Sequence, residues 1–304
     1  HGDCLEVLRG MPDASVDAVA TDPPYFRVKS EAWDRQWGHD GAYLDWLSSI
    51  IDEWWRVLRS NGSVYCFASP QMAARVEVRI GQRFNVLNTI TWQKPPYSTK
   101  AEMFDKSTMR GFFPASERII FAEHYFEPLR LYLASERDRA GWTTRRVAEE
   151  YQKVTGSRTV TGMAGHWFER VQWALPTAAN YQWLRQLFNQ SGGDYLRREY
   201  EDLRRPFAVT PDVPYTDVWT FKTVQAYKGK HPCEKPVDMM EHIIRTSTKP
   251  GAVVLDCFAG SGSTGVACAR NDRSFIGIEK DESWADYARR RIAEAANHLY
   301  AEAK

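Results

Sequence analysis

Asp22 begins the run "DPPY", which is separated by Thr21 from the largely apolar stretch at residues 16–20. Two prolines end a strand and fix the backbone φ angles of the turn. Because Pro23 and Pro24 carry no N–H group, the turn presents carbonyl and carboxylate acceptors without competing donors. Tyr25 adds a flat face on which a planar group could stack. The pattern suits the binding of a hydrogen-bond donor beside an aromatic ring, although an ordinary proline turn at a strand end fits the same residues.

A glycine turn near the end of the chain is the second candidate site. An apolar run ends at Asp256 and is followed by Gly260, Gly262 and a helical pattern. Glycines permit a tight turn, and the free N–H groups of a helix N-terminus suit a carboxylate or phosphate. Glu279 ends the next apolar run, where an acid can accept hydrogen bonds from ribose hydroxyls. The spacing matches neither G-x-G-x-x-G nor the P-loop, and an ordinary strand–helix loop with a solvated Glu279 is the alternative.

The elements that must position these two turns alternate between strand-like and helix-like patterns. Such alternation predicts an α/β fold, with a mainly parallel sheet covered by helices on both faces. The predicted strands cover 16–21, 62–69, 84–94, 116–124, 216–221, 253–255 and 274–281, and the predicted helices include 42–58, 71–82, 235–248 and 282–299.

The rhythm changes to helical, aromatic and arginine-rich between Pro128 and about Pro211. Residues 129–206 hold 12 Arg and 1 Lys against 9 Asp and Glu. This basic excess suits phosphates and guanine edges, and a solvated helical face is the alternative. We therefore predict three segments, which are the first part of the α/β domain at 1–128, an inserted helical domain at 129–211, and the second part of the α/β domain at 212–304.

Composition indicates a soluble globular protein of 304 residues, with 43% hydrophobic and 26% charged residues and a net charge of +1. No apolar run is long enough to cross a bilayer and no leader is visible, so we expect a cytoplasmic protein. None of the five cysteines forms a C-x-x-C pair. We expect reduced thiols and no metal site.

The runs "TDPPY" and "DCFAGSGST" together resemble the S-adenosylmethionine-dependent amino methyltransferases of DNA, which methylate N6 of adenine or N4 of cytosine. "GDCL" at the start and "HPCEKP" (231–236) are also typical of these enzymes. The catalytic motif precedes the cofactor motif with an insert between them, which resembles the β class, where the insert is the target-recognition region. The resemblance covers nearly the whole chain except the insert. It implies a Rossmann-like fold with a seven-stranded, mainly parallel sheet, one antiparallel strand, and double-stranded DNA as substrate.

The resemblance also implies roles for individual residues. Asp22 and the Pro23 carbonyl would each accept a hydrogen bond from the exocyclic amino group, and Tyr25 would stack on a base flipped out of the duplex. Lys235 is expected to pair with the methionine carboxylate of the cofactor. The predicted catalytic residues are Asp22, Pro23, Pro24 and Tyr25, and the predicted cofactor-binding residues are Asp3, Cys4, Asp22, His231, Lys235, Pro236, Asp256, Phe258, Ala259, Gly260, Gly262, Ser263, Thr264, Glu279 and Lys280.

Residues 142–173 of the insert resemble a helix-turn-helix unit, whose second helix would enter the major groove. A place in the core of a small helical domain, or in a dimer face, is the alternative for His166 and Trp167. The predicted base readers are His166, Trp167 and Arg170, and the predicted phosphate contacts are Arg145, Arg146 and Arg158.

The sequence therefore predicts a site-specific N6-adenine DNA methyltransferase of the β class, of the kind found in restriction-modification systems and commonly dimeric. Asp-Pro-Pro-Tyr is associated with adenine in this family, and N4 of cytosine is the alternative. Methylation of RNA or of a protein glutamine is disfavoured, because those enzymes usually carry Asn first and place the cofactor motif upstream. A non-catalytic DNA-binding regulator is the alternative outside enzymology, and the intact Asp22, Gly260, Gly262 and Glu279 argue against it.

Overall fold

The computed structural model describes the chain except for residues 27, 29–34, 95–106, 108–109, 113, 160–161, 210–214 and 303–304, and it describes residues 298–302 by their backbone alone. The chain divides into two compact units. One, the α/β unit, comprises His1–His124 and Pro206–Lys304, and the other, the helical unit, comprises Tyr125–Arg205. The predicted boundary at 211/212 lies outside the described residues, and the first division falls a few residues before the predicted 128/129.

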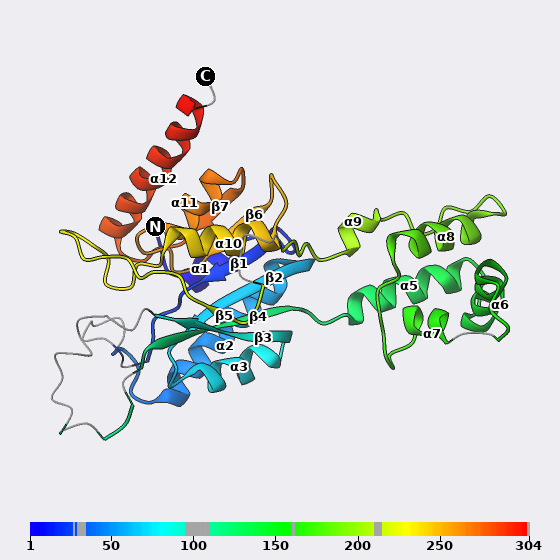
Figure 1. Ribbon diagram of the computed structural model, residues 1–304, viewed down its shortest axis with the longest axis horizontal. Helices are drawn as coiled ribbons and strands as arrows, with labels where there is room; N and C mark the ends of the chain where they lie inside the picture. Colours follow the sequence, from blue (N-terminus) through cyan, green and yellow to red (C-terminus); the bar gives the residue numbers. More distant parts are fainter. Residues whose placement is uncertain are drawn as a thin grey trace. The chain divides into compact units, whose positions relative to one another are not determined.

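The α/β unit is built on a seven-stranded sheet with the order β5-β3-β4-β2-β1-β6-β7 (Figure 1). Strand β4 runs antiparallel to both of its neighbours, and the other pairs are parallel. The expectation of a mainly parallel sheet with one antiparallel strand is confirmed. The strands are β1 (Val16–Thr21), β2 (Leu58–Ala68), β3 (Phe84–Gln93), β4 (Ser116–His124), β5 (Val218–Trp219), β6 (Val253–Asp256) and β7 (Ser274–Gly277).

Helices cover both faces of this sheet. Buried side chains of α2 and α3 pack in one cluster on one face, those of α10 and α11 pack in another cluster on the other face, and α12 contacts α11. Parallel neighbours such as β6 and β7 are joined by a crossover helix, which packs on one face of the sheet. The helices of this unit are α1 (Cys4–Arg9), α2 (Asp40–Val57), α3 (Ala73–Gly81), α10 (Val237–Ser247), α11 (Ser263–Arg270) and α12 (Glu282–Glu302).

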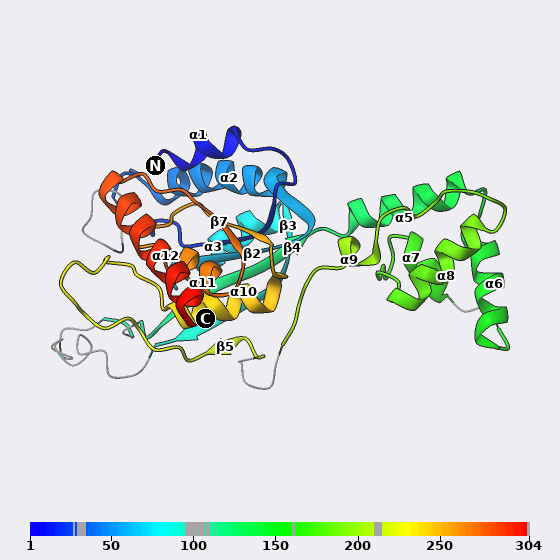
Figure 2. The ribbon, with the colours of Figure 1, turned by 90° about the horizontal axis from the view of Figure 1, so that it is seen from above.

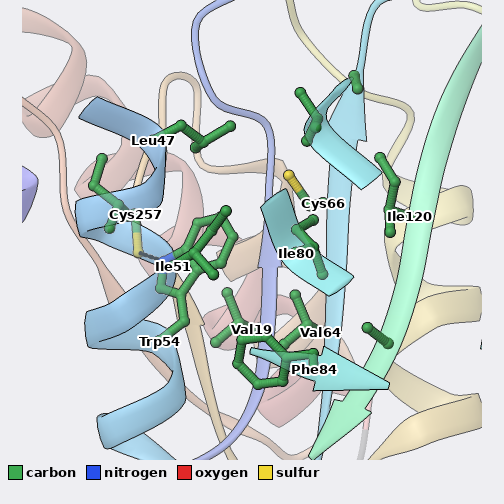
Figure 3. Close-up of a cluster of buried hydrophobic side chains, with 14 of the residues drawn as sticks. Val19, Leu47, Ile51, Trp54, Val64, Cys66, Ile80, Phe84, Ile120 and Cys257 are labelled. Carbon is green, nitrogen blue, oxygen red and sulfur yellow. Dashed lines mark hydrogen bonds between the residues drawn. The ribbon is translucent and has the colours of Figure 1, made fainter. Parts of the chain in front are cut away.

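Alternation along the central strands divides the core into two layers. Val19 of β1 belongs to the cluster under α2 and α3, whereas its neighbours Ala18 and Ala20 belong to the cluster under α10 and α11. Successive side chains of a strand point to opposite faces, so both faces of β1 are buried. Figure 3 shows the first layer, where the indole N–H of Trp54 lies 3.1 Å from the Cys257 sulfur.

The helical unit has its own hydrophobic core. Phe168, Tyr181 and Leu184 are buried in one cluster with Trp167, which is 1% exposed. Threonine side chains at the N-termini of α6 and α8 accept backbone N–H groups, which stabilises the first turn of each helix. The helices, seen in Figure 2, are α5 (Glu127–Arg139), α6 (Thr144–Thr155), α7 (Met163–Phe168), α8 (Ala178–Asn189) and α9 (Tyr200–Leu203).

The predicted second helix of the helix-turn-helix differs from the structure. The sequence pattern predicts a helix over 162–173, but α7 ends at Phe168. Gln172, within the expected helix, has a positive φ of 53°, which is incompatible with a right-handed helix. The tip between α6 and α7 includes residues 160–161, which lie outside the described residues.

Candidate functional site

The Asp-Pro-Pro-Tyr turn leaves the carboxyl end of β1 at the middle of the sheet. Thr21, the last residue of β1, donates from its hydroxyl to Asp256 at 2.7 Å and accepts from the Cys257 N–H at 3.1 Å. Neighbouring parallel strands β1 and β6 end at the same edge, so these bonds join the two candidate sites. The sheet brings together motifs that are far apart in the sequence.

Asp22 uses its two carboxylate oxygens differently. The Oδ2 atom accepts a hydrogen bond from Lys235 Nζ at 2.5 Å, whereas the Oδ1 atom is buried and has no hydrogen-bond partner among the residues that the structure describes. A buried polar atom without a partner is costly, and in native structures a catalytic role or a bound water or ion is among its explanations. Burial raises the pKa of Asp22 despite the opposing charge of Lys235.

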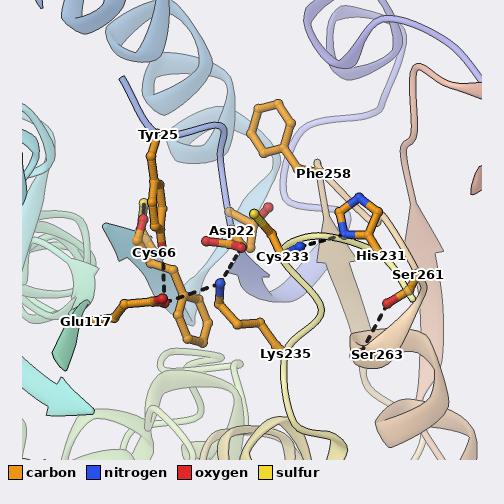
Figure 4. A network of polar contacts seen from close by, with 12 residues as sticks. Asp22, Tyr25, Cys66, Glu117, His231, Cys233, Lys235, Phe258, Ser261 and Ser263 are labelled. Atoms are coloured by element: carbon orange, nitrogen blue, oxygen red, sulfur yellow. Dashed lines mark hydrogen bonds and ion pairs between the residues drawn. The ribbon is translucent and has the colours of Figure 1, made fainter. Parts of the chain in front are cut away.

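Tyr25 and Lys235 are tied to Glu117, a residue on β4. The Tyr25 hydroxyl donates to Glu117 Oε2 at 3.1 Å, and Lys235 Nζ lies 3.3 Å from the same oxygen (Figure 4). Lys94 contacts the other oxygen, Oε1, at 2.5 Å. Burial would raise the pKa of Glu117, but the charges of Lys235 and Lys94 outweigh it and lower the pKa to about 2. The neighbouring carboxylates likewise raise the pKa of Lys235 above its ordinary value, although its burial acts in the opposite direction.

The glycine turn is organised by Asp256. This buried carboxylate accepts from the Thr264 hydroxyl at 2.6 Å and from the Phe258 N–H at 3.1 Å, in addition to Thr21. Burial raises the pKa of Asp256 to about 6, and the hydroxyl hydrogen bonds oppose the shift. Asp256 and Thr264 are buried and paired with each other, so they stabilise the conformation of the glycine turn.

Positive φ angles at Gly260 and Gly262 make the turn specific for glycine. A Cβ on Gly262 would lie 2.9 Å from the Cβ of Ala288, and a Cβ on Gly260 would lie 3.1 Å from the His231 ring. The backbone N–H of Gly260 donates to Glu279 Oε2 at 2.8 Å. A carboxylate has about four acceptor positions, so Glu279 can still accept further hydrogen bonds.

Asp3 lies at the start of α1, beside the end of β7. Its carboxylate accepts the N–H of Leu5 at 3.0 Å and lies 3.3 Å from Lys280 Nζ. The backbone N–H of Gly2 donates to the carbonyl of Glu279 at 2.9 Å. These contacts hold the first residues of the chain against the acid that follows β7.

The segment 231–236 is fixed to the glycine turn by α12. The His231 ring meets the Trp284 ring edge-on, with 4.6 Å between centroids. Glu234 pairs with Arg291 at 2.9 Å, and Arg291 also donates to the carbonyl of Ser261 in the glycine turn at 3.1 Å. The segment therefore covers one side of the site.

These pieces surround a cavity of about 700 Å³. A volume of that size accommodates a nucleoside-sized ligand. Two of the predicted residues, Pro236 and Gly262, do not line the cavity. The predicted residues that line it are Asp3, Cys4, Asp22, Pro23, Pro24, Tyr25, His231, Lys235, Asp256, Phe258, Ala259, Gly260, Ser263, Thr264, Glu279 and Lys280.

Several cavity residues were not predicted from the sequence. Trp46 of α2 packs against Phe258 with 5.7 Å between ring centroids, and Phe67 and Trp284 also line the cavity. Each belongs to a helix or strand whose apolar pattern is explained by core packing, so periodicity carries no sign of a second role. Glu117, which does not line the cavity but contacts Tyr25 and Lys235, was also missed, although a charged residue just before the apolar run 119–122 is a usable signal.

The predicted DNA-binding residues have different fates in the helical unit. Trp167 is buried in the core, so its prediction as a base reader is wrong, because a base edge must reach the side chain that reads it. His166 is half-buried. The arginines Arg145, Arg146, Arg158 and Arg170 are exposed.

Three further features of the part of the chain that the structure describes concern metal ligands, membrane-spanning helices and cysteines. In that part of the chain, no group of three His, Cys, Asp or Glu side chains could hold a metal ion. No helix within the described ranges is both long and apolar enough to cross a membrane. The five cysteines all lie in the described ranges and form no disulfide; Cys4, Cys66, Cys257 and Cys268 are buried, and Cys233 is half-buried.

The chain matches the family model described as DNA methylase (N6_N4_Mtase) over residues 16–290. The DNA adenine methyltransferase YhdJ of Escherichia coli K12 is 26% identical over 99% of this chain and 84% of its own length. The Type II methyltransferase M2.DpnII of Streptococcus pneumoniae is 28% identical over 98% of this chain and 89% of its own length.

Solved structures show the same fold. The M1.HpyAVI–SAM complex aligns with a TM-score of 0.55 at 19% identity, over 96% of this chain and 97% of that one. The cytosine-N4-specific PvuII DNA methyltransferase aligns with a TM-score of 0.58 at 16% identity, over 98% of this chain and 90% of that one.

Fold and site together define an α/β methyltransferase, in which a proline turn and a glycine turn meet at one cavity. The family match then makes the assignment specific. The chain belongs to the N6/N4 DNA methylase family.

Proposed function

We propose that this protein transfers a methyl group from S-adenosylmethionine to N6 of an adenine that is flipped out of double-stranded DNA at a specific site. Family membership and the relative named as a DNA adenine methyltransferase support this reaction. The observation that carries the proposal is the unpartnered Oδ1 atom of Asp22 at the cavity.

Asp22 Oδ1 and the carbonyl of Pro23 act as two acceptors for one amino group. The lone pair of an exocyclic amine is delocalised into the base, so the nitrogen is a poor nucleophile. Two hydrogen bonds in a fixed geometry draw the nitrogen toward a tetrahedral arrangement and direct its lone pair. When the nitrogen forms its fourth bond it must release a proton, and the raised pKa of Asp22 makes this carboxylate a suitable acceptor.

Tyr25 provides the face on which the flipped base stacks. Its hydroxyl is held by Glu117, so the ring is fixed before the base arrives. A base inside a duplex cannot reach a buried carboxylate, and stacking on an aromatic ring offsets part of the cost of extruding it.

The glycine turn, Asp3 and Glu279 fit S-adenosylmethionine. The positive φ angle of Gly260 brings bare backbone to the cavity, where a side chain would meet the His231 ring, while Gly262 allows the close packing of the turn against Ala288. Glu279 accepts the N–H groups of Gly260 and Asp281 and has acceptor positions left for ribose hydroxyls, and Asp3 beside it would serve as the acid near the adenine of the cofactor. When bound, S-adenosylmethionine supplies a methyl group made electrophilic by its positively charged sulfur. We assign Lys235 to Asp22 rather than to the methionine carboxylate, because Lys235 already contacts Asp22 and Glu117.

The exposed arginines of the helical unit are proposed to contact DNA phosphates. Arg145 is 88% exposed, and its ion pair with Glu149 is on the surface, where such pairs contribute little. Arg158 and Arg170 are exposed as well. Phosphate contacts would position the duplex, while base readers in the same unit set the site.

The reaction is tested with tritiated S-adenosylmethionine and duplexes that contain randomised sequence. We expect label in DNA, and digestion to nucleosides should place it in N6-methyladenine. Label in N4-methylcytosine would replace adenine by the other target of the family. Binding of the cofactor without transfer to any duplex would contradict the proposal and favour a DNA-binding regulator.

We also propose that the protein acts as a homodimer in the cytoplasm. Light scattering after size-exclusion chromatography measures the first property directly. A monomer at concentrations where the enzyme is active would contradict it.

A further inference from the structure

Glu117 lies at the same end of the sheet as Asp22, because β4 runs antiparallel to its neighbours. It is the second residue of this strand, which runs antiparallel to β2 and β3. The amino end of an antiparallel strand lies at the carboxyl edge of its parallel neighbours, and Asp22 leaves β1 at that same edge. Lys94 follows the last residue of β3 and is joined to this end by a 2.9 Å backbone bond to Ala115.

Two residues of the site converge on one oxygen of Glu117. The Oε2 atom receives the Tyr25 hydroxyl at 3.1 Å and faces Lys235 Nζ at 3.3 Å. In Figure 4 the dashed contacts run from Tyr25 to Glu117, from Glu117 to Lys235, and from Lys235 to Asp22. The Glu117 carboxylate thus fixes both the ring of Tyr25 and the ammonium group of Lys235, which contacts Asp22.

Lys94 keeps the charge of Glu117 from competing with Asp22. Two carboxylates and two ammonium groups alternate along the chain of contacts Asp22–Lys235–Glu117–Lys94, and their formal charges cancel. Buried charges need such partners, because an unpaired one is strongly destabilising. With Lys94 on Oε1, Glu117 does not draw Lys235 away from Asp22, which is the closer partner of that lysine.

We propose that Glu117 is a positioning residue for the methyl transfer, which holds Lys235 on the Oδ2 atom of Asp22 and Tyr25 at the stacking position, so that Oδ1 is left for the amino group of the base. The inference rests on the proposed function. Glu117 does not line the cavity, so it acts through its partners and not by touching a ligand.

Removing the negative charge of Glu117 has a predictable effect on acid dependence. Burial raises the pKa of Asp22, and the charge of Glu117 raises it further. Glu117→Gln therefore lowers the pKa of Asp22 and moves the acidic limb of kcat to lower pH. The titratable groups that face Asp22 are Tyr25, Cys66, Glu117, Cys233, Lys235 and Asp256.

The test compares Glu117→Gln with Glu123→Gln, a variant at the opposite end of β4. We expect Glu117→Gln to lower kcat about 10- to 100-fold and to shift the acidic limb downward, with the cofactor dissociation constant changed less than about twofold. Glu123→Gln should leave all three unchanged. Equal kcat and equal pH profiles for the two variants would overturn the inference.

A double variant separates positioning from folding. Glu117→Gln leaves Lys94 without its partner, whereas Lys94→Met/Glu117→Gln restores the charge balance of the network. We expect the double variant to regain the thermal stability of the wild type but to keep the low kcat. Recovery of kcat together with stability would mean that Glu117 has a structural role alone, and would refute the inference.

The same assay shows whether the proposed function itself has failed. Wild-type protein that binds the cofactor but labels no DNA contradicts the methyl transfer, and a positioning role in that reaction falls with it. Active wild type with unaffected Glu117 variants contradicts the inference alone.

Discussion

Replacement of Asp22 by asparagine turns the orientation of one amide group into a measure of the proposed mechanism. Asn keeps the shape of Asp but has one acceptor oxygen and one N–H₂ donor. Lys235, 2.5 Å from Oδ2, donates and cannot accept, so it selects the amide oxygen for its own side. The N–H₂ group then occupies the position of Oδ1 and faces the amino group of the base, donor against donor.

The expected loss follows from the two contacts that change. A hydrogen bond to a charged acceptor contributes about 1.5–3 kcal/mol, and a buried donor left unsatisfied costs about 1–3 kcal/mol. Together they raise the barrier by roughly 3–5 kcal/mol, which corresponds to a rate about 10²- to 10⁴-fold lower. Single-turnover transfer with saturating cofactor measures this directly, and calorimetric titration should show cofactor binding largely unchanged.

A second substitution tests the reasoning behind that loss. In Asp22→Asn/Lys235→Met the lysine no longer selects the amide oxygen, so the amide can rotate and present its oxygen to the base. Glu117 still has Lys94 as its partner. We expect the double variant to be about tenfold faster than Asp22→Asn alone, since the donor–donor contact is removed. The account is refuted if Asp22→Asn transfers at the wild-type rate, or if removing Lys235 makes it slower still.

Three further perturbations test other parts of the structure. The pKa of Asp256 is raised from 3.8 to about 6, so between these pH values the folded protein binds a proton that the unfolded chain releases. The free energy of unfolding should therefore fall by roughly 3 kcal/mol as pH rises from about 4 to about 6. Thermal unfolding of Asp256→Asn should lack this pH dependence. Gly262→Ala places a Cβ 2.9 Å from Ala288 at a φ of +79°, whereas Gly251→Ala has a φ of +78° and open space; chemical denaturation should show about 1–3 kcal/mol more loss for Gly262→Ala, and equal losses would contradict the close packing of α12. Arg145→Ala and Arg158→Ala should each weaken binding to DNA of any sequence and reduce the slope of log K against log salt by about 1, while Arg289→Ala on α12 should not.

Sequence patterns predicted those features of the fold that depend on local periodicity. The apolar run at 16–21 is β1, and 116–124 is β4, both with the expected bounds. The middle residues of both strands are buried, so the apolar runs at 18–20 and 119–122 stand out from the surroundings. The end of α7 was not predictable in the same way, because aromatic and basic residues continue past Phe168 while the backbone turns at Gln172.

Burial decided which of the candidate DNA-binding residues were wrong. Trp167 and Arg170 stand three residues apart in a run that fits an exposed helix as well as a packed one. Trp167 lies in the core of the helical unit, and Arg170 is exposed. A small domain must bury its largest apolar side chains to be stable, and this requirement is global, so no local pattern reveals which tryptophan meets it.

The sequence by itself determined the chemistry of the two turns. Proline and glycine act through their own backbone limits, so their positions along the chain directly indicate a rigid acceptor turn and a bare helix entrance. The tertiary structure alone decided which charged groups surround the Asp22 carboxylate and which of its oxygens is left without a partner among the described residues. Lys94, Glu117 and Lys235 come from separate parts of the chain and meet because β4 is reversed in the sheet. Electrostatic interactions depend on distance in space and on burial, and neither quantity is written in the spacing of residues along the chain.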